Sequence, residues 1–189
     1  MSVLENLKEF PTLESDRLLL RQFDVTDAPE IKRLASAKEI AQYTSIPHPY
    51  GDGVAESWIE MLAREFEAGN TLAFAVTRKS DGQFMGCSSL RMQSRHNIAA
   101  MGYWIGVPYW GKGFTTEAAR EVMAFGFNAL NLHRIYAEHM GTNLGSGKVM
   151  QKIGMKLEGR LREHFDRYGE REDSVVYGML RSEFEALAH

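Results

Sequence analysis

Apolar residues follow two patterns along the chain, and these patterns predict alternating strands and helices. Short apolar runs between turn residues predict strands, whereas apolar residues at three- and four-residue spacing predict amphipathic helices. One such stripe is Val54, Trp58, Leu62 and Phe66, in a helix that Asp52 is expected to cap. The other expected helices are residues 24–37, 114–130 and 143–153. The expected strands are residues 17–23, 71–78, 83–92, 98–107, 132–140, 155–165 and 173–180.

The order of these elements predicts one domain built on a mixed sheet. The early strands follow one another closely, and the segment Ser80-Asp81-Gly82 between two of them is typical of a hairpin turn. Helices separate the later strands, as in parallel crossover connections. The chain has 189 residues, against roughly 150 for an average domain, and it carries no repeat or linker-like segment. We therefore expect a single α/β domain over residues 1–189.

Composition and charge exclude several classes of protein. A net charge of −3 gives no electrostatic reason to bind nucleic acid or an acidic membrane, and no apolar run approaches the ~18 residues of a membrane span. The single cysteine, Cys87, rules out an internal disulfide and fits a reducing compartment. The histidines form no closely spaced pair of the kind that binds zinc. We expect a cytoplasmic protein without a metal, nucleic-acid or membrane partner.

The segment GYWIGVPYWGKGFTTEA is the most informative part of the sequence. In it Gly111, Lys112 and Gly113 open the longest expected helix, so the backbone can approach a ligand closely. The first N–H groups of a helix have no partner within it and lie at the positive end of its dipole, which suits a phosphate. Thr115 and Thr116 could add hydroxyl donors. A turn that only caps the helix is the alternative interpretation.

Two well-known phosphate motifs do not match. The dinucleotide pattern G-x-G-x-x-G fails because Thr116 stands where the third glycine belongs. The segment GTNLGSGKV is close to a P-loop, but its glycines are too far apart and Val149 replaces the hydroxyl that binds magnesium. A nucleotide-binding protein is therefore the weakest of the possible interpretations.

Three blocks together resemble the GNAT superfamily of N-acetyltransferases, and most closely the branch of ribosomal-protein N-terminal acetyltransferases (RimJ/RimL type). They are GYWIGVPYWGKGFTTEA, NLHRIYAEHMGTNLGSGKVMQKIGMKLEGRLRE and YGEREDSVVYGML, with weaker support from LESDRLLLRQF. The resemblance covers most of residues 13–182. It implies a splayed, mixed central sheet with helices on both faces, and transfer of an acetyl group from acetyl-CoA to a primary amine. The amine would be a protein N-terminus or a small molecule.

Other functions stay open within this resemblance. An acetyltransferase for antibiotics or polyamines is one alternative, and a catalytically silent module that binds acyl-CoA is another. By analogy the protein would be a monomer or a homodimer.

The resemblance also implies roles for individual residues. Backbone groups of Ile105 and Val107 would hold the pantetheine arm like an added strand, and Asn143 would contact the same arm. Ser146 would lie near the sulfur as the catalytic acid for the departing thiolate. The full set of implied cofactor contacts is Ile105, Gly106, Val107, Gly111, Lys112, Gly113, Phe114, Thr115, Thr116, Asn143 and Ser146.

One departure from the family pattern bears on the choice of amine. Ala100 stands where many relatives have a glutamate that is a candidate general base, and the facing strand offers Glu138 and His139 instead. Alternation cannot say which of the two faces the reacting groups. With a pKa near 7.7–8.0, roughly 10–15% of an α-amine is neutral at pH 7, whereas a lysine side chain is about 3.4 pKa units away. We expect α-amines or other low-pKa amines to be favoured.

Three residues are expected to bind the acceptor. Tyr43 and His48 lie in a loop between two helices, together with Tyr50, and Asp173 matches a family aspartate near the final hairpin. A solvated loop and a structural ion pair are the respective alternatives.

Overall fold

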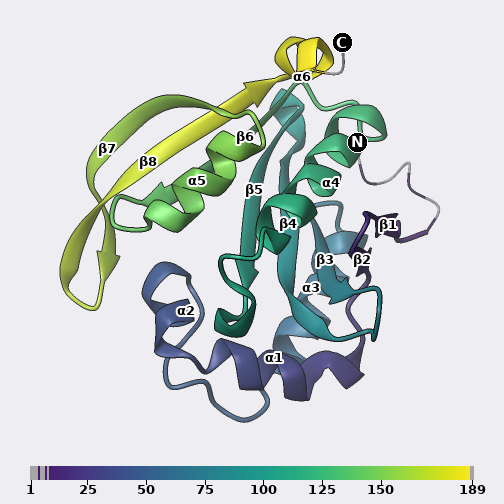
Figure 1. Ribbon diagram of the computed structural model, residues 1–189, viewed down its shortest axis with the longest axis vertical. Coiled ribbons are helices and arrows are strands. Elements are labelled where there is room, and N and C mark those ends of the chain that lie inside the picture. Colours follow the sequence, from purple (N-terminus) through teal and green to yellow (C-terminus); the bar gives the residue numbers. More distant parts are fainter. Residues whose placement is uncertain (1–3, 5–6, 8, 188–189) are drawn as a thin grey trace.

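The computed structural model describes residues 4, 7 and 9–187, and in it an eight-stranded mixed sheet runs through the molecule (Figure 1). The strand order across the sheet is β1-β2-β3-β4-β5-β6-β8-β7. The strands are β1 (Leu13–Glu14), β2 (Leu18–Arg21), β3 (Thr71–Arg78), β4 (Phe84–Gln93), β5 (Ile98–Ile105), β6 (Arg134–Met140), β7 (Lys156–Arg167) and β8 (Glu170–Leu180). The α-helices are α1 (Ala28–Ala35), α2 (Lys38–Tyr43), α3 (Val54–Glu67), α4 (Phe114–Asn128), α5 (Leu144–Lys152) and α6 (Arg181–Leu187).

The sheet changes character between β5 and β6. All other neighbouring strands are antiparallel, whereas these two are parallel and pair only from Ile98 with Arg134 to Ala100 with Tyr136. Beyond Ala100 the described strands form no further ladder pairs with each other. We call this unpaired part, residues 101–105 of β5 and 137–140 of β6, the β5–β6 divergence. It leaves strand edges inside the sheet, where an extended ligand could pair.

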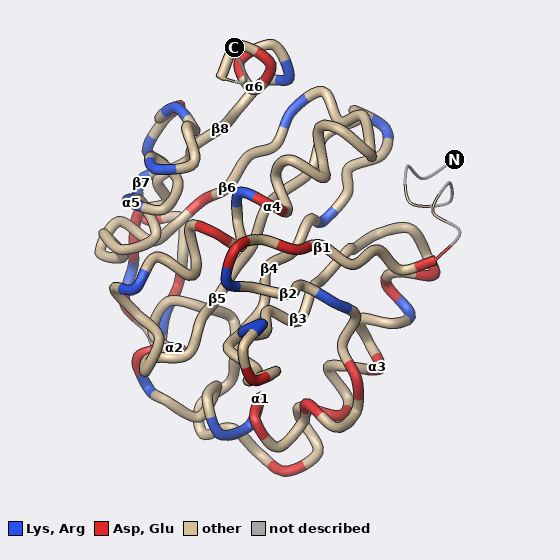
Figure 2. Tube along the Cα trace, turned by 45° about the vertical axis from the view of Figure 1, so that its right-hand side comes forward, with Lys and Arg blue, Asp and Glu red and all other residues tan. Residues whose placement is uncertain are grey.

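Helices cover both faces of the sheet and give it two apolar cores. On one face α4 and α5 lie over the centre of the sheet, and on the other α1 and α3 pack against it (Figure 1). Side chains alternate along a strand, so β5 sends Met101 and Ile105 into the first core and Trp104 into the second. Figure 2 shows that basic and acidic residues are interspersed along the chain, in agreement with the small net charge.

The structure confirms the expected α/β architecture and most of the expected elements. Three were not predicted, β1, α2 and α6, each of which has seven residues or fewer. Two predictions were wrong in detail. Asp52 does not cap α3, because Gly53 takes the N-cap position with φ 75° and Asp52 pairs with Lys32 instead. The last hairpin turn is shorter than residues 166–172, since β7 continues to Arg167 and β8 begins at Glu170.

Candidate active site

The expected phosphate-binding turn lies at the N-terminus of α4, after the end of β5. Gly111 has φ 73° and Gly113, the N-cap, has φ 82°, conformations that residues with a side chain rarely adopt. In the described structure no side chain caps this helix, and its first backbone hydrogen bond runs from Glu117 N to the Gly113 carbonyl. The N–H groups of Phe114, Thr115 and Thr116 therefore lack partners within the helix. This arrangement fits a pyrophosphate.

Glu117 and Arg17 tie the turn to the N-terminal strands. The Glu117 carboxylate accepts hydrogen bonds from Ser15 Oγ (2.7 Å), Arg17 N (2.9 Å) and Arg17 Nε (2.7 Å), while Arg17 Nη1 donates to the Lys112 carbonyl at 3.1 Å. Burial of Glu117 raises its pKa, but the hydrogen bonds from Ser15 and Arg17 outweigh it and leave the pKa below its ordinary value. The Lys112 ammonium donates to the Pro108 carbonyl at 2.9 Å, so it is turned toward its own loop.

Backbone groups of Ile105 and Val107 were expected to bind the pantetheine arm, but their carbonyls already accept hydrogen bonds from Trp110. The Trp110 indole Nε1–H donates to the Ile105 carbonyl at 2.5 Å, and the Trp110 backbone N–H donates to the Val107 carbonyl at 3.1 Å. Val107 begins a 3-10 turn, η4 (Val107–Tyr109), rather than continuing the strand. A pantetheine arm that used these two carbonyls would have to displace Trp110. Periodicity gave no signal for this contact.

Asn143 and Ser146 are brought together at the start of α5. Asn143 is the N-cap, and its Oδ1 accepts from Ser146 N at 3.1 Å, so only its NH₂ group is left to donate to a ligand. Ser146 Oγ lies 2.9 Å from the Tyr103 hydroxyl, which also donates to the Ser146 carbonyl at 3.1 Å. Burial raises the pKa of Tyr103 to about 12. Sequence reasoning missed Tyr103 because 43 residues separate it from Ser146.

The two candidate bases on β6 lie on opposite faces of the sheet. His139 is 8% exposed, stacks on Tyr177 and lies directly beneath Gly147 of α5, with Nδ1 2.7 Å from the Met140 carbonyl. Glu138 is exposed on the other face, where Oε2 accepts from Ser174 Oγ at 2.6 Å. Glu138 is therefore the carboxylate that an incoming acceptor could meet, on the face of the sheet that carries α1 and α3.

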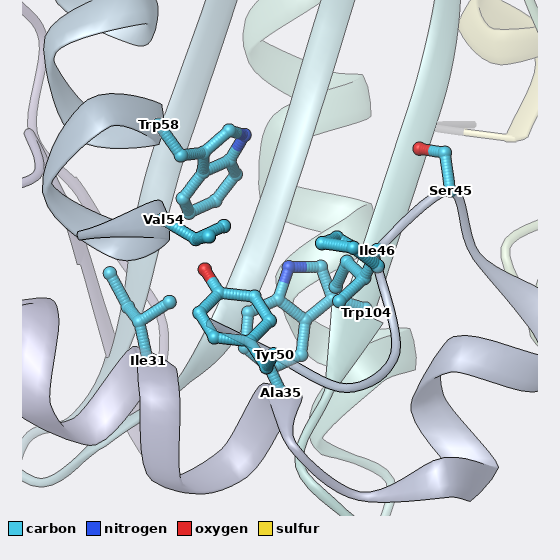
Figure 3. A pocket seen from close by; sticks show the side chains of 9 residues that line it. Ile31, Ala35, Ser45, Ile46, Tyr50, Val54, Trp58 and Trp104 are labelled. Atoms are coloured by element: carbon cyan, nitrogen blue, oxygen red, sulfur yellow. The ribbon is translucent and has the colours of Figure 1, made fainter. Parts of the chain in front are cut away.

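That face also holds a cavity of about 120 Å³ (Figure 3). It is lined by Ile31, Ala35, Ser45, Ile46, Pro47, Tyr50, Val54, Trp58 and Trp104. The loop expected to bind the acceptor does contribute to it, but through Ser45, Ile46, Pro47 and Tyr50. Tyr43, the last residue of α2, and the exposed His48 are not among the lining residues.

Asp173 forms an ion pair with Arg160. Its carboxylate accepts from Arg160 Nε at 2.5 Å and from Glu163 N at 2.8 Å. The Glu163 N–H and the Arg160 guanidinium lower the pKa of Asp173 below its usual value. Close by in the chain, the Arg167 guanidinium donates to the carbonyls of Ala41 and Thr44, which fastens the β7–β8 hairpin to the end of α2.

Other chemistry is not indicated by the residues that the structure covers. Among the described side chains no group of three or more His, Cys, Asp or Glu residues could hold a metal ion. No helix in the described ranges is long and apolar enough to cross a membrane. Cys87 is buried, and burial raises the pKa of its thiol to about 12, so it is a poor nucleophile.

Comparison with known proteins agrees with this geometry. Residues 17–156 match the family described as an acetyltransferase (GNAT) domain. The uncharacterized N-acetyltransferases YoaA of Bacillus subtilis (strain 168) and p20 of Bacillus licheniformis are each 30% identical, over 91% and 92% of this chain and 98% of their own. The solved structure of RimL, a ribosomal L7/L12 alpha-N-protein acetyltransferase in complex with coenzyme A, has a TM-score of 0.83 at 16% identity and covers 90% of this chain and 98% of its own. With its family match, its full-length relatives and its divergent β5–β6 pair, the chain belongs to the GNAT family of N-acetyltransferases.

Proposed function

We propose that this N-acetyltransferase moves the acetyl group of acetyl-CoA to the α-amine of a protein N-terminus or to a small-molecule amine of similar pKa. The observation that carries the proposal is the β5–β6 divergence with the helix N-terminus of α4 beside it. An extended pantetheine arm fits the unpaired strand edges, and a pyrophosphate fits the N–H groups at the start of α4. Coenzyme A is bound in the RimL structure and acetyl-CoA in that of the MccE acetyltransferase.

The cofactor contacts follow from this placement. We assign the pyrophosphate to Gly111, Gly113 and the first turn of α4, and the pantetheine to the end of β5 and to the Asn143 NH₂ group. Lys112 reaches the phosphates only if its ammonium leaves the Pro108 carbonyl. Phe114 packs under the guanidinium of Arg17, whose carbon lies 4.3 Å from the ring centroid, and so holds the turn in place.

Acetyl transfer at this site is direct. The neutral amine attacks the thioester carbonyl, the C–N bond forms, the C–S bond breaks, and one amine proton is finally carried by the thiol. A thiol has a pKa near 8.5, well below the value of about 12 for Tyr103. Tyr103 therefore keeps its proton when the sulfur departs. Because that single O–H donates to the Ser146 carbonyl, the Ser146 hydroxyl, which Tyr103 positions, is the donor that stabilises the thiolate.

We assign to Glu138 the role of binding the incoming amine and taking up its proton. It is exposed on the acceptor face, and its carboxylate is oriented by Ser174. Ala100, which replaces the usual glutamate, lies on the same face, since Ala100 pairs with Tyr136 and Glu138 follows two residues later. A single carboxylate on this face attracts an ammonium ion and can take up its proton. A cytoplasmic location and a monomer or homodimer remain predictions.

Thermal unfolding with separate ligands tests the proposal. A ligand at 100 times its Kd adds about 2.7 kcal/mol, which for a chain of this size raises Tm by roughly 5–10 °C. We expect that rise with acetyl-CoA and with CoA, and none with ATP or NADH. Release of free thiol from acetyl-CoA in the presence of an N-terminal peptide then measures the transfer. A Tm rise confined to ATP or NADH, or no rise at all, contradicts the proposal.

A further inference from the structure

The cavity on the face of the sheet that carries α1 and α3 is small, and most of its lining surface is apolar. Aliphatic and aromatic side chains form its walls, Ser45 is at its rim, and none of the lining residues carries a charge. Its volume of about 120 Å³ is close to the ~150 Å³ of a protein cavity that takes up benzene. A group the size of one aromatic ring, or a branched aliphatic group, would fill it.

One hydrogen-bond donor points into this apolar space. Trp104 is 9% exposed, and its Nε1–H has no acceptor among the described residues. Figure 3 shows the nitrogen-bearing edge of the indole turned toward the space between Tyr50, Val54 and Ile46. An indole nitrogen only donates, and buried donors in folded proteins are nearly always paired. A ligand in the cavity could therefore supply the hydrogen-bond acceptor that the Trp104 indole N–H lacks.

The cavity lies next to the place where acetyl transfer is proposed. Trp104 and Gly102 point to the same face of β5, about 6.6 Å apart along the strand, and both belong to the β5–β6 divergence. Glu138 of β6 is on that face as well. An acceptor whose amine lies at the divergence can thus place its side group in the cavity.

We propose that the acceptor amine carries a ring-sized apolar side group with one hydrogen-bond acceptor atom, which fills this cavity and accepts from Trp104 Nε1–H. This inference rests on the proposed function and names its substrate class. The Tyr50 hydroxyl, whose pKa burial raises, offers a second polar contact at the cavity wall. A polyamine is disfavoured, because a second ammonium group would meet no carboxylate in the lining.

Matched amines test the proposal by thiol release from acetyl-CoA. Tyrosinamide carries a ring hydroxyl on an α-amine, 4-methylphenylalaninamide replaces that hydroxyl by a methyl group, and spermidine is a flexible polycation. We expect kcat/KM for tyrosinamide to exceed that of both others by at least about tenfold. A tripeptide that begins with tyrosine presents the same α-amine and side group on a longer chain, so its rate relative to tyrosinamide distinguishes a protein N-terminus from a free small amine.

Two variants locate the effect in the cavity. Trp104→Phe keeps an aromatic ring but removes the donor, so the preference for tyrosinamide over 4-methylphenylalaninamide should fall toward one. Val54→Phe fills the cavity and should lower kcat/KM for both ring amines, without changing the Tm rise caused by CoA. Val25→Phe makes the same change at a site that is 63% exposed and should behave as the unmodified protein.

A binding measurement gives a readout that does not depend on turnover. The chain has three tryptophans, and Trp104→Phe identifies the Trp104 indole N–H signal in a nitrogen-15 NMR spectrum. Tyrosinamide should shift that signal saturably in the natural protein and not in Val54→Phe. An unmoved Trp104 signal, or spermidine as the better substrate, overturns the inference. If CoA still raises Tm in that case, the proposed function survives, whereas failure of CoA binding removes the function itself.

Discussion

The hydroxyl of Tyr103 lies 2.9 Å from Oγ of Ser146 and donates to the carbonyl of the same serine at 3.1 Å. Tyr103 belongs to β5, and Ser146 belongs to α5, which follows β6. The pair therefore joins the two sides of the β5–β6 divergence. Two hydroxyl groups meet where the thioester sulfur is proposed to lie, although they are far apart in the sequence.

Removal of either hydroxyl should slow the chemical step. We expect Ser146→Ala and Tyr103→Phe each to lower kcat by about 10- to 100-fold, because the first removes the donor to the departing thiolate and the second removes the hydroxyl that positions this donor. The affinity for acetyl-CoA should change little, which equilibrium binding can check. Because the hydroxyls act as a pair, the double variant should be little slower than the worse single variant. Equal kcat in Ser146→Ala and in the natural protein would remove its assigned role.

Gly113→Ala should weaken binding of CoA. An alanine at φ 82° is strained by about 1 kcal/mol, and relief of that strain turns the first N–H groups of α4 away from the phosphates. We expect Kd for CoA to rise about tenfold, equivalent to ~1.4 kcal/mol, by titration calorimetry. Gly82→Ala is the control, since Gly82 has φ 71°, lies in open space and belongs to the β3–β4 turn. It should lose similar stability and keep its affinity for CoA.

The enzyme should prefer α-amines to lysine side chains at neutral pH. Holding a lysine neutral at pH 7 costs about 4.6 kcal/mol, whereas an α-amine is already partly neutral. Rates with a peptide that has a free N-terminus, and with a blocked peptide containing one lysine, should differ most at pH 7. The difference should narrow toward pH 9, because the neutral fraction of lysine grows about tenfold per pH unit while that of the α-amine levels off. Equal rates at pH 7 and matched binding contradict this prediction.

Replacement of Glu138 tests its part in the same preference. Glu138→Gln keeps the acceptor for Ser174 but loses the negative charge, so turnover at pH 7 should fall. If the carboxylate takes up the amine proton, the loss should shrink as the pH rises and more amine is neutral. A loss that is equal at every pH would indicate a structural role for Glu138.

The Glu117 carboxylate should make stability depend on pH in the acidic range. Its pKa is lower in the folded protein than in the unfolded chain, where it is about 4.3, so its contribution is present above that pH. The contribution is lost as the pH falls through the lower, folded pKa. Glu117→Gln should cost about 1–2 kcal/mol at pH 7 by urea unfolding, and this cost should shrink as the pH falls below the unfolded pKa. Glu30→Gln, at a surface pair with Arg33, should change stability by less than about 0.5 kcal/mol.

The local parts of the site could be predicted from the sequence, and the long-range parts could not. Gly111, Gly113 and the start of α4 form the expected turn, because a glycine turn before a helix is encoded within a few neighbouring residues. The face to which Glu138 points depends on the register between β5 and β6, which no single strand encodes. The Tyr103–Ser146 contact likewise depends on how two distant segments pack together, which neither segment encodes alone.

The acceptor side was harder still to predict. The loop before α3 was expected to face the acceptor, but which of its side chains line the cavity depends on how the loop packs against α1 and β5. Tyr50 lines the cavity, whereas Tyr43 and His48 are not among its lining residues. The six-residue helix α2 is too short to give a periodic signal, and so its end at Tyr43 was not anticipated.

The contact between Trp110 and the end of β5 has a consequence for the behaviour of the protein without its co-substrate. Exposed strand edges attract the strands of other chains and so promote aggregation. The Trp110 indole and backbone N–H groups cover the carbonyls of Ile105 and Val107. Trp110 is itself 44% exposed, so this cover lies at the surface of the protein. The residue that a pantetheine arm would displace thus also keeps these carbonyls from pairing with a strand of another chain.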